Sequence, residues 1–282
     1  MDTFYELLNN SGFSYLGWGN WVMFAIAGVL IYLAIKKEYE PLLLIPIGFG
    51  IILANLPLAQ MGSYNEGIIA LIYDGGIKTE LLPPLIFLGV GVLTDFRPLL
   101  SQPITFLLGA AAQLGIFVAA MCAAYIFGFT FSEAASIGII GGADGPTSIF
   151  LSSKLAPHLL GPIAIAAYSY MSLVPIIQPP VMKLLTTKHE RAISMPALRS
   201  VSKTAVILFP LITGIVSSLA IPSCAPLMGM LMFGNLLRES GVTERLRKTA
   251  GSALIDIVTI FLGLAVGATM SSGNFLNWQT LG

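Results

Sequence analysis

Long apolar runs alternate with short polar or charged stretches along most of the chain. Several runs approach the roughly 20 residues that an α-helix needs to cross a bilayer, whereas the apolar piece at 68–73 is too short to do so. The pattern predicts an all-α polytopic membrane protein. The expected apolar helices lie at 18–35, 41–57, 81–94, 103–129, 134–152, 159–180, 204–221, 226–237 and 250–269.

Glycine and proline interrupt some of these runs, because neither residue continues a helix well. Gly48 and Gly50 are expected to break the run at 41–57. The consecutive prolines at 179–180 are interpreted as a stop signal that ends the run at 159–180.

Composition agrees with a membrane protein. Of the 282 residues, 56% are hydrophobic and only 10% are charged, whereas soluble domains carry about 25% charged residues. The formal net charge is zero and no long basic run occurs, which excludes nucleic acid as an expected partner. Asp2 and Glu6 stand where a secretory signal would be basic, so we expect no cleavable signal peptide. Cys122 and Cys224 are expected to be small core residues.

One break carries a charge. The segment Gly141-Gly-Ala-Asp-Gly-Pro146 divides an apolar run, and Asp144 lies inside it. A carboxylate at membrane depth costs about 2.5 kcal/mol or more, so it needs a partner or a function. A broken helix frees carbonyl groups such as that of Gly142, while Thr147 and Ser148 add hydroxyls. Because hard cations prefer oxygen ligands, the break predicts a site for a cation such as Na⁺.

A structural alternative remains open at this stage. Asp144 would then cap the outgoing helix in a Gly-Pro turn at a membrane boundary, and Thr147 would only support that cap.

The distribution of Lys and Arg predicts the orientation. Following the positive-inside rule, we place the basic residues at 36–37, Arg97, 183–203 and 238–248 in the cytoplasm, and the N-terminus outside. This assignment requires that the run at 134–152 does not cross fully. The charges therefore predict that the glycine-broken segment is a re-entrant hairpin.

A weak internal repeat suggests an inverted-repeat, transporter-like bundle. Ile86-Phe-Leu-Gly-Val-Gly-Val-Leu-Thr-Asp-Phe96 resembles Ile260-Phe-Leu-Gly-Leu-Ala-Val-Gly-Ala-Thr269, and the segment at 41–55 resembles the one at 226–238. The predicted topology runs the two copies in opposite directions, as in many secondary transporters. A second hairpin should follow the second copy, and we interpret its absence before Gly282 as an incomplete second repeat.

These observations give an expected organisation in four parts. Residues 1–40 form an N-terminal transmembrane helix, and residues 41–182 form the first repeat with the Asp144 hairpin. Residues 183–203 form a basic cytoplasmic loop. Residues 204–282 form a connecting helix and the start of the second repeat.

Tyr168 and Tyr170 lie in the middle of an apolar run, where a hydroxyl needs a partner. One of them could serve an ion site or move a proton, or both could pack between helices. Asp256 is interpreted as a first-turn acid favoured by the helix dipole. Two further groups are expected to be ion-pair clusters in loops. They are Asp95 with Arg97, and Asn235 with Arg238 and Glu239.

Six motifs of the chain are specific enough to compare with known families. They are Gly138-Ile-Ile-Gly-Gly-Ala-Asp-Gly-Pro-Thr147, Leu151-Ser-Ser-Lys-Leu-Ala-Pro157, Ala166-Ala-Tyr-Ser-Tyr-Met171, Pro175-Ile-Ile-Gln-Pro-Pro180, Glu40-Pro-Leu-Leu-Leu-Ile-Pro-Ile-Gly-Phe-Gly50 and Phe233-Gly-Asn-Leu-Leu-Arg-Glu-Ser-Gly241. Together they resemble the β subunits of the sodium-pumping biotin-dependent decarboxylases, whose members act on oxaloacetate, methylmalonyl-CoA, glutaconyl-CoA or malonate. The resemblance covers essentially the whole chain, while the family carries a further C-terminal portion.

The resemblance implies a function and a location. Carboxybiotin, brought by a biotin carrier or carboxyltransferase subunit, would be decarboxylated with uptake of a proton, and the reaction would drive Na⁺ out of the cell. A small membrane subunit would complete an oligomeric complex in the bacterial inner membrane. Asp144 matches the family's sodium-binding aspartate, and Tyr170 matches the tyrosine assigned to ion or proton handling.

Two other functions are compatible with the residues alone. A secondary Na⁺-coupled transporter of a small anion also needs inverted repeats and broken helices. A silent membrane anchor for partner subunits is the third hypothesis.

Overall fold

The structure is a computed structural model that describes residues 10–59, 61, 67–194 and 199–276. All regular elements in this part of the chain are helical, which confirms the predicted all-α class. The longer helices are α2 (Trp18–Lys37), α3 (Pro41–Ala54), α5 (Leu82–Leu93), α7 (Thr105–Tyr125), α9 (Gly145–Leu155), α10 (Leu160–Leu185), α12 (Lys203–Ala220), α13 (Ala225–Ser240) and α15 (Ile255–Ala268). The shorter ones are η1 (Gly12–Tyr15), α4 (Ile68–Ile72), η2 (Tyr73–Lys78), α6 (Arg97–Ser101), α8 (Phe131–Gly138), η3 (Ile139–Gly142), η4 (Pro157–Leu159), α11 (Lys188–Arg191), η5 (Pro222–Cys224), α14 (Glu244–Thr249), η6 (Ala250–Leu254) and α16 (Ser272–Phe275).

Membrane-crossing helices dominate the described residues. By length and composition, five helices there can span a bilayer, which confirms a multi-pass membrane protein. A sixth candidate is the pair Ile68–Lys78 and Leu82–Leu93, bent by 65° at a short break. The five are Trp18–Lys37, Thr105–Tyr125, Pro157–Leu185, Lys203–Ala220 and Glu244–Ala268.

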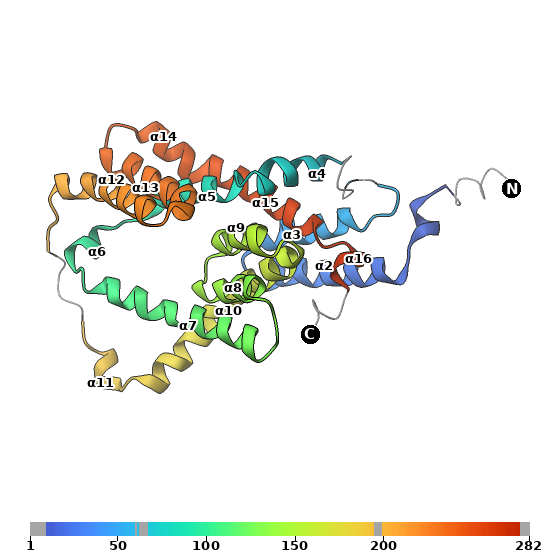
Figure 1. Ribbon diagram of the computed structural model, residues 1–282, viewed down its shortest axis with the longest axis horizontal. Helices are drawn as coiled ribbons and strands as arrows, with labels where there is room; N and C mark the ends of the chain where they lie inside the picture. Colours follow the sequence, from blue (N-terminus) through green and yellow to red (C-terminus); the bar gives the residue numbers. More distant parts are fainter. Residues whose placement is uncertain (1–9, 60, 62–66, 195–198, 277–282) are drawn as a thin grey trace.

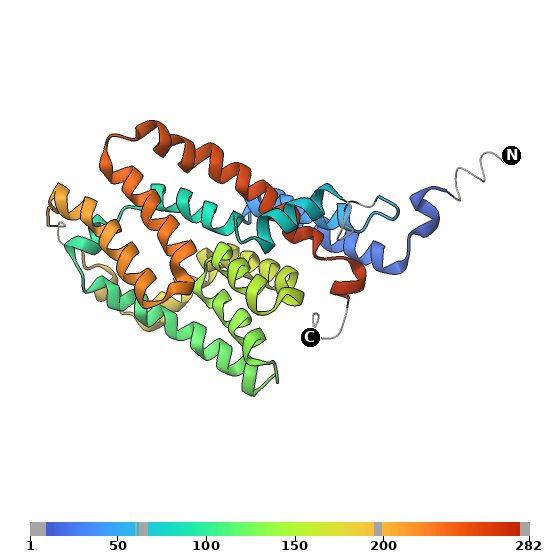
Figure 2. The same ribbon diagram turned by 45° about the horizontal axis from the view of Figure 1, so that its top comes forward.

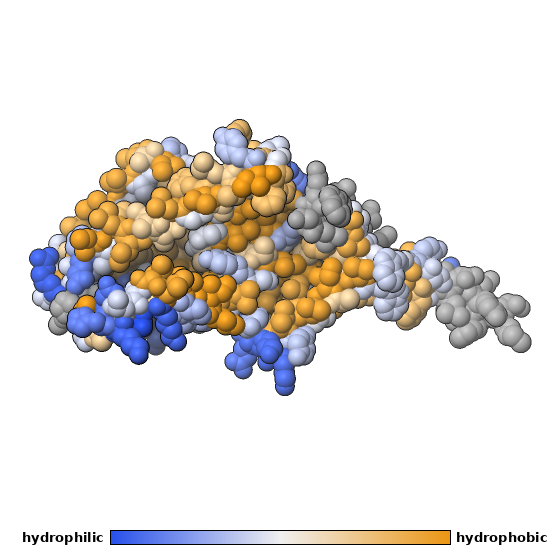
Figure 3. Space-filling view, turned by 90° about the horizontal axis from the view of Figure 1, so that it is seen from below, coloured by the Kyte–Doolittle hydropathy of each residue, from blue (hydrophilic) through white to orange (hydrophobic). Residues whose placement is uncertain are grey.

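The outer surface suits contact with lipid. On α7, large apolar side chains such as Phe106, Leu114 and Phe117 are more than 60% exposed. Figure 3 shows hydrophobic residues over much of one face, with hydrophilic residues gathered mainly at one end and at the lower edge. In water such a surface would aggregate, so these helices are stable only where lipid or other protein covers them.

Helices from the two ends of the sequence pack together in the core. Figures 1 and 2 show α15 running beside α3 and α5, and α13 lying against α5. The hairpin of α8 and α9 lies with α7 and α10 in a second group. The main buried cluster joins α2, α3, α10 and α15 through side chains such as Met23, Ile47, Leu160 and Leu262.

Glycine permits the closest of these crossings, between α5 and α13. A Cβ added to Gly91 would lie 2.0 Å from the carbonyl oxygen of Leu231. A Cβ added to Gly234 would lie 2.1 Å from the carbonyl oxygen of Leu88. The two backbones therefore touch directly, as small residues allow between membrane helices.

The crossing of α3 and α15 repeats this arrangement. A Cβ on Gly50 would lie 2.5 Å from the carbonyl oxygen of Leu264, and one on Gly267 would lie 2.2 Å from that of Ile47. In both pairs, each glycine therefore faces the carbonyl of a residue three positions before the opposite glycine.

Buried asparagines close both crossings. The Asn235 side-chain amide donates to the carbonyl of Thr94 at 2.9 Å, just after α5. The Asn55 amide donates to the carbonyl of Met270 at 2.8 Å, just after α15, and its oxygen accepts from the Ser272 N–H at 2.8 Å. Each amide satisfies carbonyl groups that a helix end leaves unpaired.

Two predicted helix breaks are wrong. Helix α3 continues through Gly48 and Gly50, because both glycines face neighbouring helices at close range, and this packing outweighs their weak helix propensity. Helix α10 continues through Pro179 and Pro180 to Leu185. Neighbouring hydrogen bonds of a long membrane helix can hold it together where a proline removes one donor.

The interpretation of Asp256 is also wrong. The helix that contains it is continuous over Glu244–Ala268, and the basic stretch at 238–248 before it is largely helical too. Asp256 therefore lies about three turns after the helix start, where the dipole has little effect. Its side chain is exposed on the outer face of α15.

Candidate functional site

The segment around Asp144 reverses the chain between two short helices. Helix α8 begins with a capping box in which Thr130 and Glu133 pair reciprocally, and it continues into η3. Ala143 then adopts the left-handed conformation at φ 53°, and Asp144 is extended. Helix α9 begins at Gly145, with Pro146 in its first turn. The predicted break is therefore present, with helix on both sides.

Ala143 is strained in this turn. A positive φ costs a residue with a Cβ roughly 1 kcal/mol or more, which glycine avoids. The surrounding contacts must hold Ala143 there, and strain of this kind is concentrated at functional sites. The backbone conformation of the turn is therefore held by its surroundings and does not depend on its glycines alone.

The Asp144 carboxylate lies at the N-cap position of α9. Its Oδ2 accepts a hydrogen bond from the Thr147 hydroxyl. Its main-chain carbonyl accepts from the Ser148 N–H at 3.1 Å and from the Ser148 hydroxyl at 2.9 Å. The predicted group of Asp144, Thr147 and Ser148 is thus brought together, with the carboxylate held beside a hydroxyl.

Free carbonyl groups precede Asp144. Within the described residues, the carbonyls of Gly141, Gly142 and Ala143 accept no hydrogen bond from a loop, a neighbouring helix or a side chain. The expectation that the break would release the Gly142 carbonyl therefore agrees with the geometry. Carbonyl, carboxylate and hydroxyl oxygens are all available within one turn of chain.

Tyr168 is the tyrosine that packs against this turn. Its ring lies over Gly145, because a Cβ on Gly145 would come within 2.1 Å of Cε1 and 2.5 Å of the hydroxyl oxygen. Tyr168 is 0% exposed. Tyr170 lies about 200° further round α10 and is 38% exposed. The structure thus brings Tyr168, rather than Tyr170, against the predicted site.

Two polar contacts hold the C-terminal end of α9. Lys154, in its last turn, pairs with Glu80 at 2.9 Å, which joins the hairpin to the segment before α5. His158 Nε2 lies 2.8 Å from Oε1 of Glu133, which joins the chain after α9 to the start of α8. Hydrogen bonds from Thr130, followed by one from His158, hold the pKa of Glu133 below its ordinary value. Sequence patterns gave no signal for either pair, since their members are far apart in the chain.

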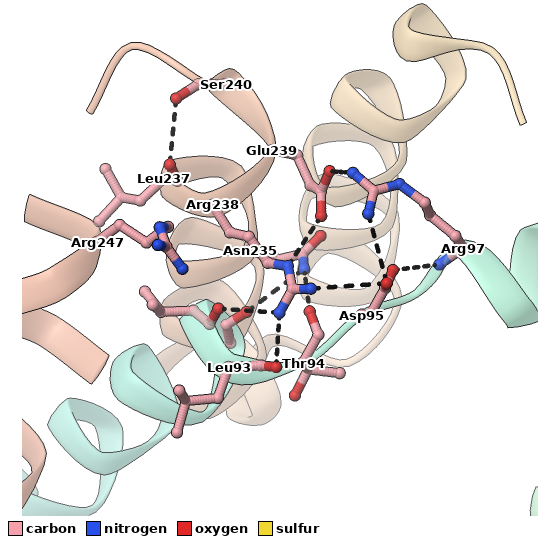
Figure 4. A network of polar contacts seen from close by, with 12 residues as sticks. Leu93, Thr94, Asp95, Arg97, Asn235, Leu237, Arg238, Glu239, Ser240 and Arg247 are labelled. Atoms are coloured by element: carbon pink, nitrogen blue, oxygen red, sulfur yellow. Dashed lines mark hydrogen bonds and ion pairs between the residues drawn. The ribbon is translucent and has the colours of Figure 1, made fainter. Parts of the chain in front are cut away.

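A second polar group lies where α5 and α13 end (Figure 4). Arg97 pairs with Asp95 at 3.4 Å and with Glu239, whose side chain is only 3% exposed. Arg238 pairs with Glu239 at 3.1 Å and with Asp95 at 3.6 Å. The two loop clusters predicted separately therefore form one network, which Asn235 extends to the carbonyl of Thr94.

This network has no free acid to offer a ligand. Each carboxylate faces guanidinium groups, so the network serves to join α5 and α13. It also brings Arg97 and Arg238 together, since both pair with Asp95 and with Glu239 (Figure 4).

Among the described residues, no group of three or more His, Cys, Asp or Glu side chains is placed to hold a metal ion. A cation at the hairpin would therefore be held by one carboxylate and neutral oxygens. Such a low charge suits a monovalent cation better than a divalent or transition metal.

Comparisons with known proteins agree on a family. A sequence model described as the beta subunit of Na⁺-transporting oxaloacetate decarboxylase matches residues 19–282. The methylmalonyl-CoA decarboxylase subunit beta of Veillonella parvula is 58% identical over 276 residues, which are 98% of this chain and 73% of that protein. The glutaconyl-CoA decarboxylase subunit beta of Acidaminococcus fermentans is 56% identical over 276 residues, with the same coverage.

A more distant relative, the oxaloacetate decarboxylase beta chain of Klebsiella pneumoniae, is 46% identical over 341 aligned positions. The alignment covers 100% of this chain and 79% of that protein. The family expected from the motifs around Asp144 is thereby confirmed. The chain belongs to the family of beta subunits of the Na⁺-transporting decarboxylases.

Proposed function

We propose that this chain is the membrane subunit in which a Na⁺-transporting decarboxylase removes CO₂ from carboxybiotin and exports Na⁺. The observation that carries the proposal is the Asp144 turn. It offers a carboxylate, a hydroxyl and carbonyl groups inside a membrane protein of this family.

The chemistry supplies both a driving force and a proton. Decarboxylation breaks the bond between a biotin ring nitrogen and the carboxyl carbon. The electron pair stays on the nitrogen, which takes up one proton, and CO₂ leaves. A carboxylate that alternately binds Na⁺ and a proton would couple this uptake to Na⁺ movement, because the two cations compete for the same charge.

The residues are assigned as follows. The Asp144 carboxylate binds Na⁺, and the Thr147 hydroxyl and the Gly142 carbonyl are neutral ligands in the same turn. Tyr170 keeps the role that the family resemblance implies, which is ion or proton handling. Because Tyr170 is partly exposed on α10, an ion or a proton can reach its hydroxyl from outside the α8–α9 hairpin.

We also propose the inverted repeat. It is supported by the matching crossings, in which Gly91 and Gly234 of one pair correspond to Gly267 and Gly50 of the other. The four-part division at residues 40, 182 and 203 remains part of this proposal, with 183–203 as the basic cytoplasmic loop.

The assembly and location follow the family. The chain would act with a biotin carrier or carboxyltransferase subunit and a small membrane subunit, as an oligomer in the bacterial inner membrane. The N-terminus would lie outside, because the polar network with Arg97 and Arg238 then faces the cytoplasm, in accord with the positive-inside rule.

The test uses the complete complex in liposomes, with Na⁺ flux and decarboxylation measured together. Asp144→Asn removes the charge and should abolish Na⁺-dependent decarboxylation and Na⁺ flux. Asp256→Asn is a matched control, since Asp256 is exposed and belongs to none of the groups described. Full Na⁺-dependent activity in the Asp144→Asn complex would refute the site. Uptake of a small anion without a biotin carrier would support the transporter instead.

A further inference from the structure

Tyr168 has a buried hydroxyl without a partner. Its side chain is fully buried, and among the described residues nothing hydrogen-bonds to its hydroxyl oxygen. A buried phenol normally finds a partner, because its polar end is costly to leave unpaired. The hydroxyl of Tyr168 is therefore an unusual feature in the core of this protein.

Neighbouring buried hydroxyls are satisfied in an ordinary way. Ser148 donates to the Asp144 carbonyl at 2.9 Å, and Ser152 donates to the Ser148 carbonyl at 2.6 Å. Ser136 likewise donates to the Ser132 carbonyl at 2.9 Å. Each bonds back to its own helix, which a tyrosine cannot do because its hydroxyl lies too far from its own backbone. The Tyr168 hydroxyl must be satisfied by something outside α10.

The position of the Tyr168 hydroxyl indicates what kind of group could satisfy it. It lies over Gly145, the first residue of α9, next in sequence to Asp144. Asp144 brings a carboxylate to this turn, and a negative group there favours a cation over an anion.

We propose that the Tyr168 hydroxyl oxygen is a ligand of the Na⁺ that Asp144 binds, an inference that rests on the function proposed above. A phenol oxygen is a neutral donor of the kind that Na⁺ accepts. Tyr168 would thus fix the distance of the ion from α10. Binding or loss of the ion would then act directly on α10 through this side chain.

Gly145 is part of the same device. Its missing side chain is what lets the ring approach, since any Cβ there would overlap Cε1 and the hydroxyl. Gly145→Ala should therefore displace the hydroxyl from the ion and weaken Na⁺ binding as much as Tyr168→Phe does. Gly109→Ala on α7 is the matched control, because its Cβ would meet nothing within 4 Å and the residue lies outside the turn.

The experiment measures equilibrium binding of radioactive Na⁺ to the purified complex, and the Na⁺ dependence of carboxybiotin decarboxylation. Tyr168→Phe keeps the ring and removes one oxygen, so the Na⁺ dissociation constant should rise about tenfold. The maximal rate at saturating Na⁺ should change less than about twofold, because only ion affinity is lost. Tyr32→Phe on α2, whose side chain is 56% exposed and lies in no proposed site, is the control and should leave Na⁺ affinity unchanged.

The outcomes separate the two proposals. If Asp144→Asn binds Na⁺ like the unmodified complex, the proposed function fails at its site. If Asp144→Asn loses Na⁺ but Tyr168→Phe and Gly145→Ala bind it normally, only the Tyr168 assignment is overturned. A lower maximal rate with an unchanged Na⁺ constant in Tyr168→Phe would also overturn it, since that pattern indicates a structural role.

Discussion

Replacing Gly91 by Ala tests whether backbone contact holds α5 against α13. The new Cβ would lie 2.0 Å from the Leu231 carbonyl oxygen, whereas real Cβ atoms essentially never come within 3.0 Å of such an atom. The neighbour is backbone, so no side-chain rotation can relieve the overlap and the two helices must separate. Overpacking of this kind costs about 1–3 kcal/mol, and a backbone clash belongs at the upper end.

The higher helix propensity of alanine offsets part of the stability lost through this overlap. Alanine favours a helix over glycine by about 1 kcal/mol, so we expect a net destabilisation of about 2 kcal/mol for Gly91→Ala. Gly109→Ala on α7 is the matched control, because its Cβ would meet nothing within 4 Å. The Gly109→Ala variant should gain the helix propensity of alanine without any steric overlap.

The assay is thermal unfolding of the purified complex in mild detergent, followed by size-exclusion fluorescence. Gly91→Ala should lower the midpoint by several degrees, while Gly109→Ala should leave it equal or higher. Equal midpoints for the two variants would refute the argument. The α5–α13 contact would then be loose enough to accept a methyl group.

Three further predictions concern the hairpin and the polar network. Ala143→Gly should relieve the positive φ and raise the thermal midpoint, with a gain of up to about 1 kcal/mol; a lower midpoint would show that the alanine side chain matters more than the strain. Glu133 contributes stability while it is ionised, so this contribution is complete above its ordinary pKa of 4.5 and is lost as the pH falls through its lowered folded-state pKa; Glu133→Gln should remove that acid limb from the pH profile of the midpoint. Glu239→Leu should destabilise the complex by about 3 kcal/mol or more, because the guanidiniums of Arg97 and Arg238 lose a buried partner; a neutral result in thermal unfolding would show that water replaces the carboxylate.

Apolar patterning predicted most of the helices because lipid demands long apolar segments with few exceptions. It also located the Asp144 turn, since a carboxylate between glycines and proline stands out in such a background. It failed where tertiary contact decides the outcome. Gly48 and Gly50 read as breaks by propensity, yet packing against neighbouring helices keeps them helical.

The choice between the two tyrosines shows a second limit. Buried residues on α10 recur at Leu160, Ile163, Ala164, Ala167 and Tyr168, which is one helical face. In a soluble helix polar residues would mark the opposite face, but here both faces are apolar and the sequence pattern does not distinguish them. Only the folded structure assigns Tyr168 to the inside.

The repeat shows a third limit. The Phe-Leu-Gly motifs align Gly89 with Gly263, whereas the contacts relate Gly91 to Gly267, two residues further along the second helix. Short apolar motifs contain too few letters to fix the register. The carbonyl that each glycine faces defines the register of the repeat more specifically than the motifs do.

The crossed helix pairs also have a consequence for synthesis of the protein. Helices α3 and α5 contact α15 and α13, so their glycine faces stay uncovered until the second half of the chain has been made. Asn55 and its partner Met270 are 215 residues apart. At about 5–20 residues per second, a ribosome needs roughly 10–40 s to cover that distance. During this interval α3 and α5 lie in the bilayer beside other membrane proteins. Their uncovered glycine faces can then pack against helices of those proteins instead of against α15 and α13.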